Sequence, residues 1–129
     1  MYKRQAIDIG TGNATVAIRL AQHFGLAIAA VELDPVMADL ARSRIEAANA
    51  GHQVSLTIAR AAQMLARTEP VDLIVALGTT DVSGEGRPTP EAGFIALRRS
   101  LKPGGWLLWG DLLWLAGPPP PPRQLTPGA

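Results

Sequence analysis

The segment Ala6-Ile7-Asp8-Ile9-Gly10-Thr11-Gly12-Asn13-Ala14 decides the fold. Its first four residues are mostly apolar, as in a short buried strand, and two spaced glycines follow before a helical pattern begins. A strand that passes through a glycine turn into a helix is typical of parallel sheets, whose strands are joined by crossover helices. We therefore expect a strand over residues 6–9, a turn over residues 10–13 and a helix over residues 14–24.

The rest of the chain repeats this alternation of apolar runs and helical patterns. Later strands are expected over residues 26–33, 53–58, 71–77 and 106–110. Later helices are expected from Asp34, as a cap before Pro35, to a stop at Gly51, and over residues 61–67 and 90–101. Residues 78–88 read as a loop and 102–105 as a turn. The strict alternation predicts an α/β fold with a doubly wound, Rossmann-like parallel sheet in strand order 3-2-1-4-5 and the third strand at an edge.

Composition excludes several classes of function. The 129 residues suit one domain, and 47% hydrophobic with 18% charged residues is typical of a globular protein. Twelve Lys and Arg against eleven Asp and Glu give a net charge of +1 without a basic cluster, so we expect no nucleic-acid partner and no membrane partner. The absence of cysteine excludes disulfides and thiolate metal sites, and it is compatible with a cytoplasmic protein.

Both ends of the chain look different from the middle. Met1-Tyr2-Lys3-Arg4-Gln5 is the translation of GTG-TAT-AAG-AGA-CAG, which resembles the end sequence used in transposase-based library preparation. We expect residues 1–5 to be a non-native arm, with a short natural arm as the alternative. Residues 118–129 begin with five prolines, and we expect them to be a disordered tail. The expected domain is residues 6–117.

The glycine turn is the first candidate for a binding site. In an open parallel sheet, ligands bind at the carboxyl ends of the strands where the strand order reverses, which here means the ends of the first and fourth strands. Gly10 permits a sharp turn, and Gly12 lets the backbone approach a ligand closely. The amide groups at the helix start suit a carboxylate or phosphate. The alternative is a turn with no ligand.

Glu32 is the second candidate. It ends the expected second strand, twenty residues after Gly12. A carboxylate there can accept both hydrogen bonds of a ribose diol, a feature of nucleoside-type cofactors. The alternative is that Glu32 only caps the loop before Asp34.

The sequence also discriminates between cofactors. A dinucleotide-binding turn carries a third glycine where this chain has Thr15. Asp8 stands next to the turn, where its charge would repel phosphates but could hold an ammonium group. A cationic ligand with an amino-acid end, such as S-adenosyl-L-methionine, satisfies both observations.

Four segments together resemble class I S-adenosylmethionine-dependent methyltransferases. Residues 6–12 are similar to the first motif of that family, residues 31–35 to the second, and residues 71–78 to the strand-four segment. The most specific match is Leu101-Lys102-Pro103-Gly104-Gly105-Trp106-Leu107-Leu108, which resembles the turn before strand five. The resemblance extends over about residues 6–111.

The resemblance implies a methyltransferase that binds S-adenosylmethionine. It implies that Gly10 and Gly12 lie near the methionine end, Glu32 on the ribose and Gly78 near the reacting methyl, with Arg60 and Ala61 beside the adenine. The implied cofactor-binding residues are Asp8, Gly10, Thr11, Gly12, Glu32, Leu33, Arg60, Ala61 and Gly78.

The sequence departs from that family in three respects. The usual third glycine is Ala14, a small change. Many members have an acidic residue after strand three that accepts a hydrogen bond from the adenine amino group, and Arg60 cannot accept one, although it could stack on the ring. The family fold also has helices before the first strand and two strands after the fifth, so the chain resembles a methyltransferase truncated at both ends.

Methyl transfer from a sulfonium is a direct displacement that needs alignment, with no required metal or covalent nucleophile. Asp81, in the expected loop after strand four, is a weak candidate for a base, and ordinary solvation in a loop is the alternative. We expect a small-molecule acceptor. Two other functions remain open: an NAD(P)-binding Rossmann oxidoreductase, favoured by the glycine turn and Glu32, and a non-catalytic cofactor-binding fragment.

Overall fold

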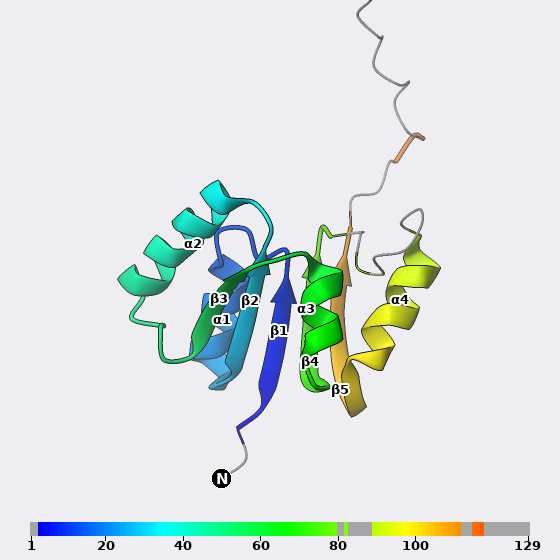
Figure 1. Cartoon of the computed structure of the whole chain (residues 1–129), viewed down its shortest axis with the longest axis horizontal. Helices are drawn as coiled ribbons and strands as arrows, with labels where there is room; N and C mark the ends of the chain where they lie inside the picture. Colours follow the sequence, from blue (N-terminus) through cyan, green and yellow to red (C-terminus); the bar gives the residue numbers. More distant parts are fainter. Residues whose placement is uncertain (1–2, 80–81, 83–88, 112–114, 118–129) are drawn as a thin grey trace, which may run out of the picture.

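The computed structural model describes residues 3–79, 82, 89–111 and 115–117. Five parallel strands form one sheet in the order β3-β2-β1-β4-β5 (Figure 1). The strands are β1 (Gln5–Ile9), β2 (Ala27–Glu32), β3 (Val54–Ile58), β4 (Val71–Leu77) and β5 (Leu101–Gly110). The predicted fold class, strand order and edge position of the third strand are confirmed. Asp81 and the proline-rich residues 118–129 lie outside the described residues.

Four helices connect the strands: α1 (Thr15–Phe24), α2 (Pro35–Ala47), α3 (Ala61–Arg67) and α4 (Pro90–Arg99). In Figure 1, α1 lies behind the sheet and α3 in front of it. Two clusters of buried side chains match this division: α1 and α2 pack on one face of the sheet, and α3 and α4 on the other. Strand β1 contributes to both clusters, because successive side chains of a strand point to opposite faces.

Helix α2 shows how local chemistry sets the ends of an element. The Asp34 carboxylate accepts a hydrogen bond from the Val36 N–H at 3.0 Å, and Pro35 occupies the first turn, as predicted. The helix ends at Ala47, before the predicted stop at Gly51. Asn49 adopts a φ of 53°, and its N–H and that of the next residue donate to carbonyls of the last turn. This Schellman-type end needs a left-handed residue, and asparagine tolerates that conformation.

Strand β5 begins earlier than predicted. Leu101 pairs with Val71 and Trp106 with Leu73, so residues 102–105 all lie opposite Asp72. The expected turn is therefore an irregularity inside β5, and α4 ends at Arg99. A β-carbon on Gly105 would lie 2.9 Å from the Lys102 carbonyl oxygen and 3.0 Å from that of Asp72. Glycine is required there because the backbone of β5 itself and the backbone of β4 leave no room for a side chain.

The start of β1 also differs from the prediction. The strand begins at Gln5, whose N–H donates to the Asp72 carboxylate at 2.9 Å, and the Arg4 carbonyl accepts the Ala27 N–H at 3.1 Å. Residues assigned to the arm thus extend the sheet. The hydrogen bonds of a sheet are made by backbone groups, which every residue carries. Residues 4 and 5 can therefore join the sheet although their side chains are not typical of a strand.

Candidate functional site

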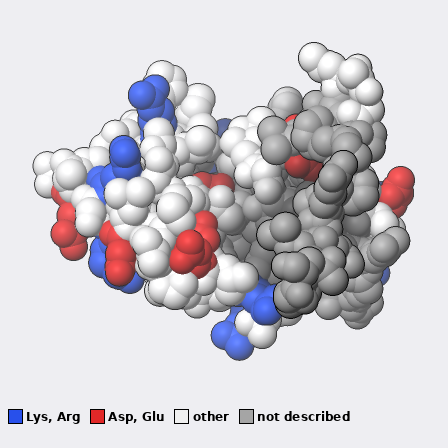
Figure 2. Space-filling view, turned by 90° about the horizontal axis from the view of Figure 1, so that it is seen from above, with Lys and Arg blue, Asp and Glu red and all other residues white. Residues whose placement is uncertain are grey.

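A cleft of about 640 Å³ lies at the carboxyl ends of the strands. Figure 2 looks down on this end of the molecule, where Asp and Glu residues, coloured red, are visible near the middle of the surface. The cleft is lined by Gly10, Val31, Glu32, Leu33, Ala59, Arg60, Ala61, Ala62, Gln63, Leu77, Gly78 and Thr79. These residues end or follow β4, β1, β2 and β3, which are neighbours in that order in the sheet. The cleft therefore crosses the point where the strand order reverses, as predicted.

The turn after β1 supplies one end of the cleft. Gly10 and Gly12 have φ of 66° and 60°, a left-handed conformation that favours glycine. The Thr11 N–H donates to the Val31 carbonyl at 2.9 Å, which ties the turn to β2. Thr79, just after β4, donates its hydroxyl to the Ile9 carbonyl at 3.3 Å and lies against Gly10. A side chain at position 10 would collide with that hydroxyl. Glycine at this position therefore lets the turn after β1 lie directly against the end of β4.

Glu32 joins the turn to the start of α2. One carboxylate oxygen accepts the Gly12 N–H and the other accepts the Asp34 N–H, both at 2.9 Å. Glu32 therefore does cap the loop before Asp34. It does not exclude ligand binding, because a carboxylate has about four acceptor positions and two of them are occupied here. The side chain is half-buried, lines the cleft and is held in one orientation.

Asp8 lies beneath the turn and is 3% exposed. Its carboxylate accepts the Thr11 hydroxyl at 2.7 Å. Burial raises the pKa of Asp8 to about 6, the Thr11 hydrogen bond opposes that shift, and the negative charge of Glu32 adds to it. A cation that reached this turn would be attracted by both carboxylates, whereas a phosphate would be repelled.

The other end of the cleft is formed by residues that follow β3 in the chain. Arg60 is the N-cap residue of α3 and makes no side-chain capping hydrogen bond. Six predicted residues line the cleft: Gly10, Glu32, Leu33, Arg60, Ala61 and Gly78. Asp8, Thr11 and Gly12 support it from beneath or beside it.

Sequence reasoning missed Gln63 as a lining residue. The available signal was the direction of α3. Side chains of a helix lean toward its N-terminus, and that end of α3 lies at the cleft. Gln63, three residues after the N-cap, therefore leans toward the cleft.

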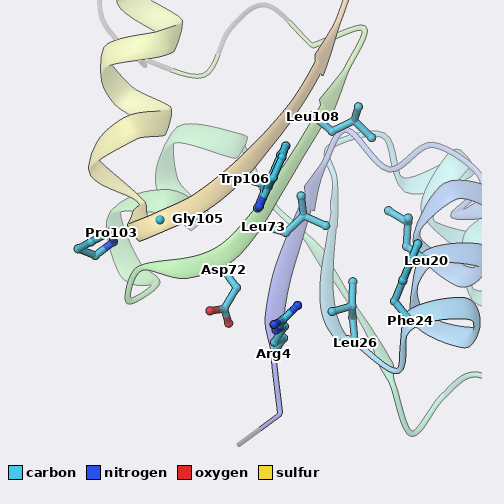
Figure 3. A pocket seen from close by; sticks show the side chains of 11 residues that line it. Arg4, Leu20, Phe24, Leu26, Asp72, Leu73, Pro103, Gly105, Trp106 and Leu108 are labelled. Atoms are coloured by element: carbon cyan, nitrogen blue, oxygen red, sulfur yellow. The ribbon is translucent and has the colours of Figure 1, made fainter.

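A second cavity, also about 640 Å³, lies on the face of the sheet that α1 partly covers. Figure 3 shows Trp106 and Leu108 projecting from β5, with Leu20 and Phe24 facing them from α1. Trp106 is 77% exposed. The groove lies away from the turn after β1, and among the described residues its charged lining is limited to Arg4 and Asp72. The two acidic groups of the candidate site do not line it.

Two further findings concern the described part of the chain. No group of three or more His, Asp or Glu side chains there could hold a metal ion. None of its helices is both long and apolar enough to cross a membrane.

The family described as a methyltransferase domain matches residues 6–105. The chain is 32% identical over 115 residues to a ribosomal protein L11 methyltransferase from Chelativorans sp. (strain BNC1), spanning 87% of this chain but 37% of that protein. A second similar protein is a SAM-dependent methyltransferase from Thiobacillus denitrificans, solved with S-adenosyl-L-homocysteine. Its TM-score is 0.71 at 24% identity, and the match covers 83% of this chain and 41% of that one.

A precorrin-6y C5,15-methyltransferase from Geobacter metallireducens GS-15 has a TM-score of 0.68 at 25% identity, covering 83% of this chain and 53% of that one. The chain thus spans between about a third and about half of the length of these proteins. The family match extends from β1 into β5 and includes the whole cleft. The chain therefore belongs to the methyltransferase domain family and has the fold of the class I S-adenosylmethionine-dependent methyltransferases.

Proposed function

We propose that this chain binds S-adenosyl-L-methionine in the cleft and forms the cofactor-binding part of a methyltransferase. The observation that carries the proposal is the position of Glu32, which lines the cleft while two backbone N–H groups hold its carboxylate. Two acceptor positions remain, as many as a ribose diol requires. A fixed carboxylate loses little conformational entropy on binding, which favours affinity.

The charges of the site fit this ligand better than a dinucleotide. Asp8 and Glu32 place two carboxylates at the turn, and Arg60 is the single cationic side chain among the described residues that line the cleft. A pyrophosphate at the turn would face both carboxylates without a compensating cation. An ammonium and a sulfonium would be attracted instead. This difference argues against the NAD(P)-binding alternative.

Each remaining residue has a proposed role. The Gly10 to Gly12 turn receives the amino-acid end, and Asp8, held by the Thr11 hydroxyl, supplies negative charge beneath it. Gly78 leaves space near the reacting methyl, and Leu33, Arg60 and Ala61 flank the adenine. When bound, S-adenosylmethionine supplies an electrophilic methyl group. The contribution of the protein is to align an acceptor behind that methyl carbon and to exclude water.

The acceptor is proposed to be a small molecule, in the cytoplasm. The absence of a basic cluster in the sequence supports this class over nucleic acid. Residues 6–117 would act as the cofactor-binding domain, with residues 1–5 as a non-native arm. Asp81 is a proposed base for acceptors that must lose a proton.

Calorimetric titration tests the proposal directly. We expect S-adenosyl-L-homocysteine and S-adenosyl-L-methionine to bind with one-to-one stoichiometry, and NADH to give no saturable heat under the same conditions. Saturable NADH binding, or no binding of either sulfur nucleoside, would contradict it.

A further inference from the structure

Asp8 is a carboxyl group enclosed by the sheet and its helices beneath the candidate cofactor site. It lies in β1, opposite Ala30 of β2 and Val75 of β4, and it is 3% exposed. It shares a face of β1 with Ala6, the face on which α1 and α2 pack. Its carboxylate accepts the Thr11 hydroxyl, a neutral donor. Because a buried carboxylate without a cationic partner is costly, such a group tends to keep its proton.

The charged groups on the elements around Asp8 do not offset its charge. On β2, Glu32 acts on Asp8, and its negative charge makes ionisation harder. On β4, Asp72 lies near the opposite end of the strand, where it accepts the Gln5 N–H at 2.9 Å and pairs with Lys102 at 3.7 Å. The titratable and charged side chains of α1 and α2 are all exposed: Arg19, His23, Asp39, Arg42, Arg44 and Glu46.

These surroundings couple the binding of a cation to the binding of a proton. Burial, with the charge of Glu32 added to it, raises the pKa of Asp8 to about 6. Without a ligand, the turn therefore takes up a proton as the pH falls through about 6. A cation at the turn would favour the ionised form of Asp8 by Coulomb attraction. Proton and cation compete for the same negative charge, so each weakens the binding of the other by the same factor.

Resting on the function proposed above, we propose that the ammonium group of the ligand replaces a proton on Asp8, so that binding of a nucleoside with an amino-acid end expels this proton under acidic conditions. The O–H bond of the carboxyl group breaks, the proton passes to the solvent and no other covalent bond changes. Affinity for such ligands then falls as the pH falls. A ligand that turned its carboxylate toward Asp8 would show the opposite dependence, because it would bind the protonated form better.

The experiment compares S-adenosyl-L-homocysteine with 5′-methylthioadenosine, which has the same nucleoside but no amino-acid end. We expect calorimetry to show that the Kd of the first rises about tenfold from about pH 7.5 to about pH 5, the change expected if the pKa of Asp8 returns from about 6 to its ordinary 3.8 on binding. The Kd of 5′-methylthioadenosine should stay within about twofold. Heats measured at about pH 5 in two buffers of different ionisation enthalpy should report release of about one proton with the first ligand alone.

Two variants assign the effect to Asp8. Asp8→Asn removes the titrating group and keeps an acceptor for the Thr11 hydroxyl, so the Kd of S-adenosyl-L-homocysteine should differ less than about twofold between the two pH values. Glu46→Gln neutralises an exposed carboxylate on α2 and is the matched control. It should keep the tenfold rise of the wild type. The count of released protons uses the wild-type chain and tests the proposal even if a variant fails to fold.

A Kd of S-adenosyl-L-homocysteine that changes less than about twofold, or that falls toward low pH, would overturn the proposal. The same dependence in Asp8→Asn, or with 5′-methylthioadenosine, would also overturn it. Each of these results leaves binding of S-adenosyl-L-homocysteine at about pH 7.5 intact, so the function proposed above would survive them. Absence of binding at both pH values would overturn both.

Discussion

Glu32 holds the loop together and faces the cleft at the same time. Its two backbone partners come from the turn after β1 and the start of α2, which precede and follow β2 along the chain. This arrangement explains why a residue with a structural role can also be placed for binding: the same hydrogen bonds that stabilise the loop fix the carboxylate.

We expect Glu32→Ala to weaken binding of S-adenosyl-L-homocysteine by about 1.5–3 kcal/mol, the scale of hydrogen bonds to a charged group. Calorimetric titration of the variant measures the change. Glu46→Ala, which removes an exposed carboxylate from α2, serves as the control and should bind like the wild type. Equal affinity of the Glu32 variant and the wild type would remove this side chain from the site.

Asp8 gives the site a predictable dependence on pH. Its folded-state pKa, about 6, lies above the ordinary value of 3.8. Below pH 3.8 the group is protonated in both the folded and unfolded states and contributes nothing. Above about pH 6 it is ionised in both, and its burial costs the folded state about 3 kcal/mol. Stability from this group therefore falls as the pH rises from about 4 to about 6.

Asp8→Asn should remove that cost while keeping an acceptor for the Thr11 hydroxyl. We expect the variant to be more stable than the wild type at about pH 7.5, by up to about 3 kcal/mol, with the gain much smaller at about pH 4.5. Urea unfolding at the two pH values measures the free energies of unfolding. A variant destabilised equally at both values would show that burial of the charge is not the dominant effect.

At the scale of elements, hydrophobic periodicity was sufficient to place most helices and strands. The bounds of α3 and β4 agree with the predictions residue for residue, because each is a short pattern with clear ends. The start of β5 was not predictable in this way. Its first residue is set by pairing with Val71, a contact across the sheet, whereas the local signal of Pro103 and two glycines indicates a turn.

The residues of the candidate site also differ in how far local sequence patterns predict them. Gly10 and Glu32 could be predicted because a turn and a strand end are local features with a known spacing. Gln63 was harder to predict, because the lean of its side chain toward the N-terminus of α3 points to the cleft only once the position of α3 at the end of the sheet is known. The burial of Asp8 likewise depends on elements that pack around it from distant parts of the chain.

The turn after β1 can be tested by a matched pair of glycine substitutions. Gly10 and Gly25 have nearly the same φ, 66° and 68°, but a β-carbon would collide with Thr79 at Gly10 and meet nothing within 4 Å at Gly25. We expect Gly25→Ala to cost about 1 kcal/mol for the left-handed backbone and Gly10→Ala to cost about 1–3 kcal/mol more because of overpacking. Chemical denaturation compares the two. Equal losses would mean that Thr79 moves aside freely.

At the scale of the whole molecule, the two faces of the sheet are covered unequally. Helices α3 and α4 cover one face, while on the other the groove beside β5 leaves Trp106 largely exposed. Two cavities of similar volume thus compete as binding sites: the cleft at the carboxyl ends and the apolar groove. We assign the cofactor to the cleft alone, because the paired carboxylates of Asp8 and Glu32 lie at that end of the sheet.

The most direct test of that assignment is a nuclear magnetic resonance titration of the chain with S-adenosyl-L-homocysteine, following the backbone amides of glycines in both cavities. We predict saturable shifts at Gly10, Gly12 and Gly78, around the cleft, with Gly104 and Gly105 in the groove unchanged. Shifts confined to the groove glycines, or no shifts at saturating ligand, would contradict the assignment.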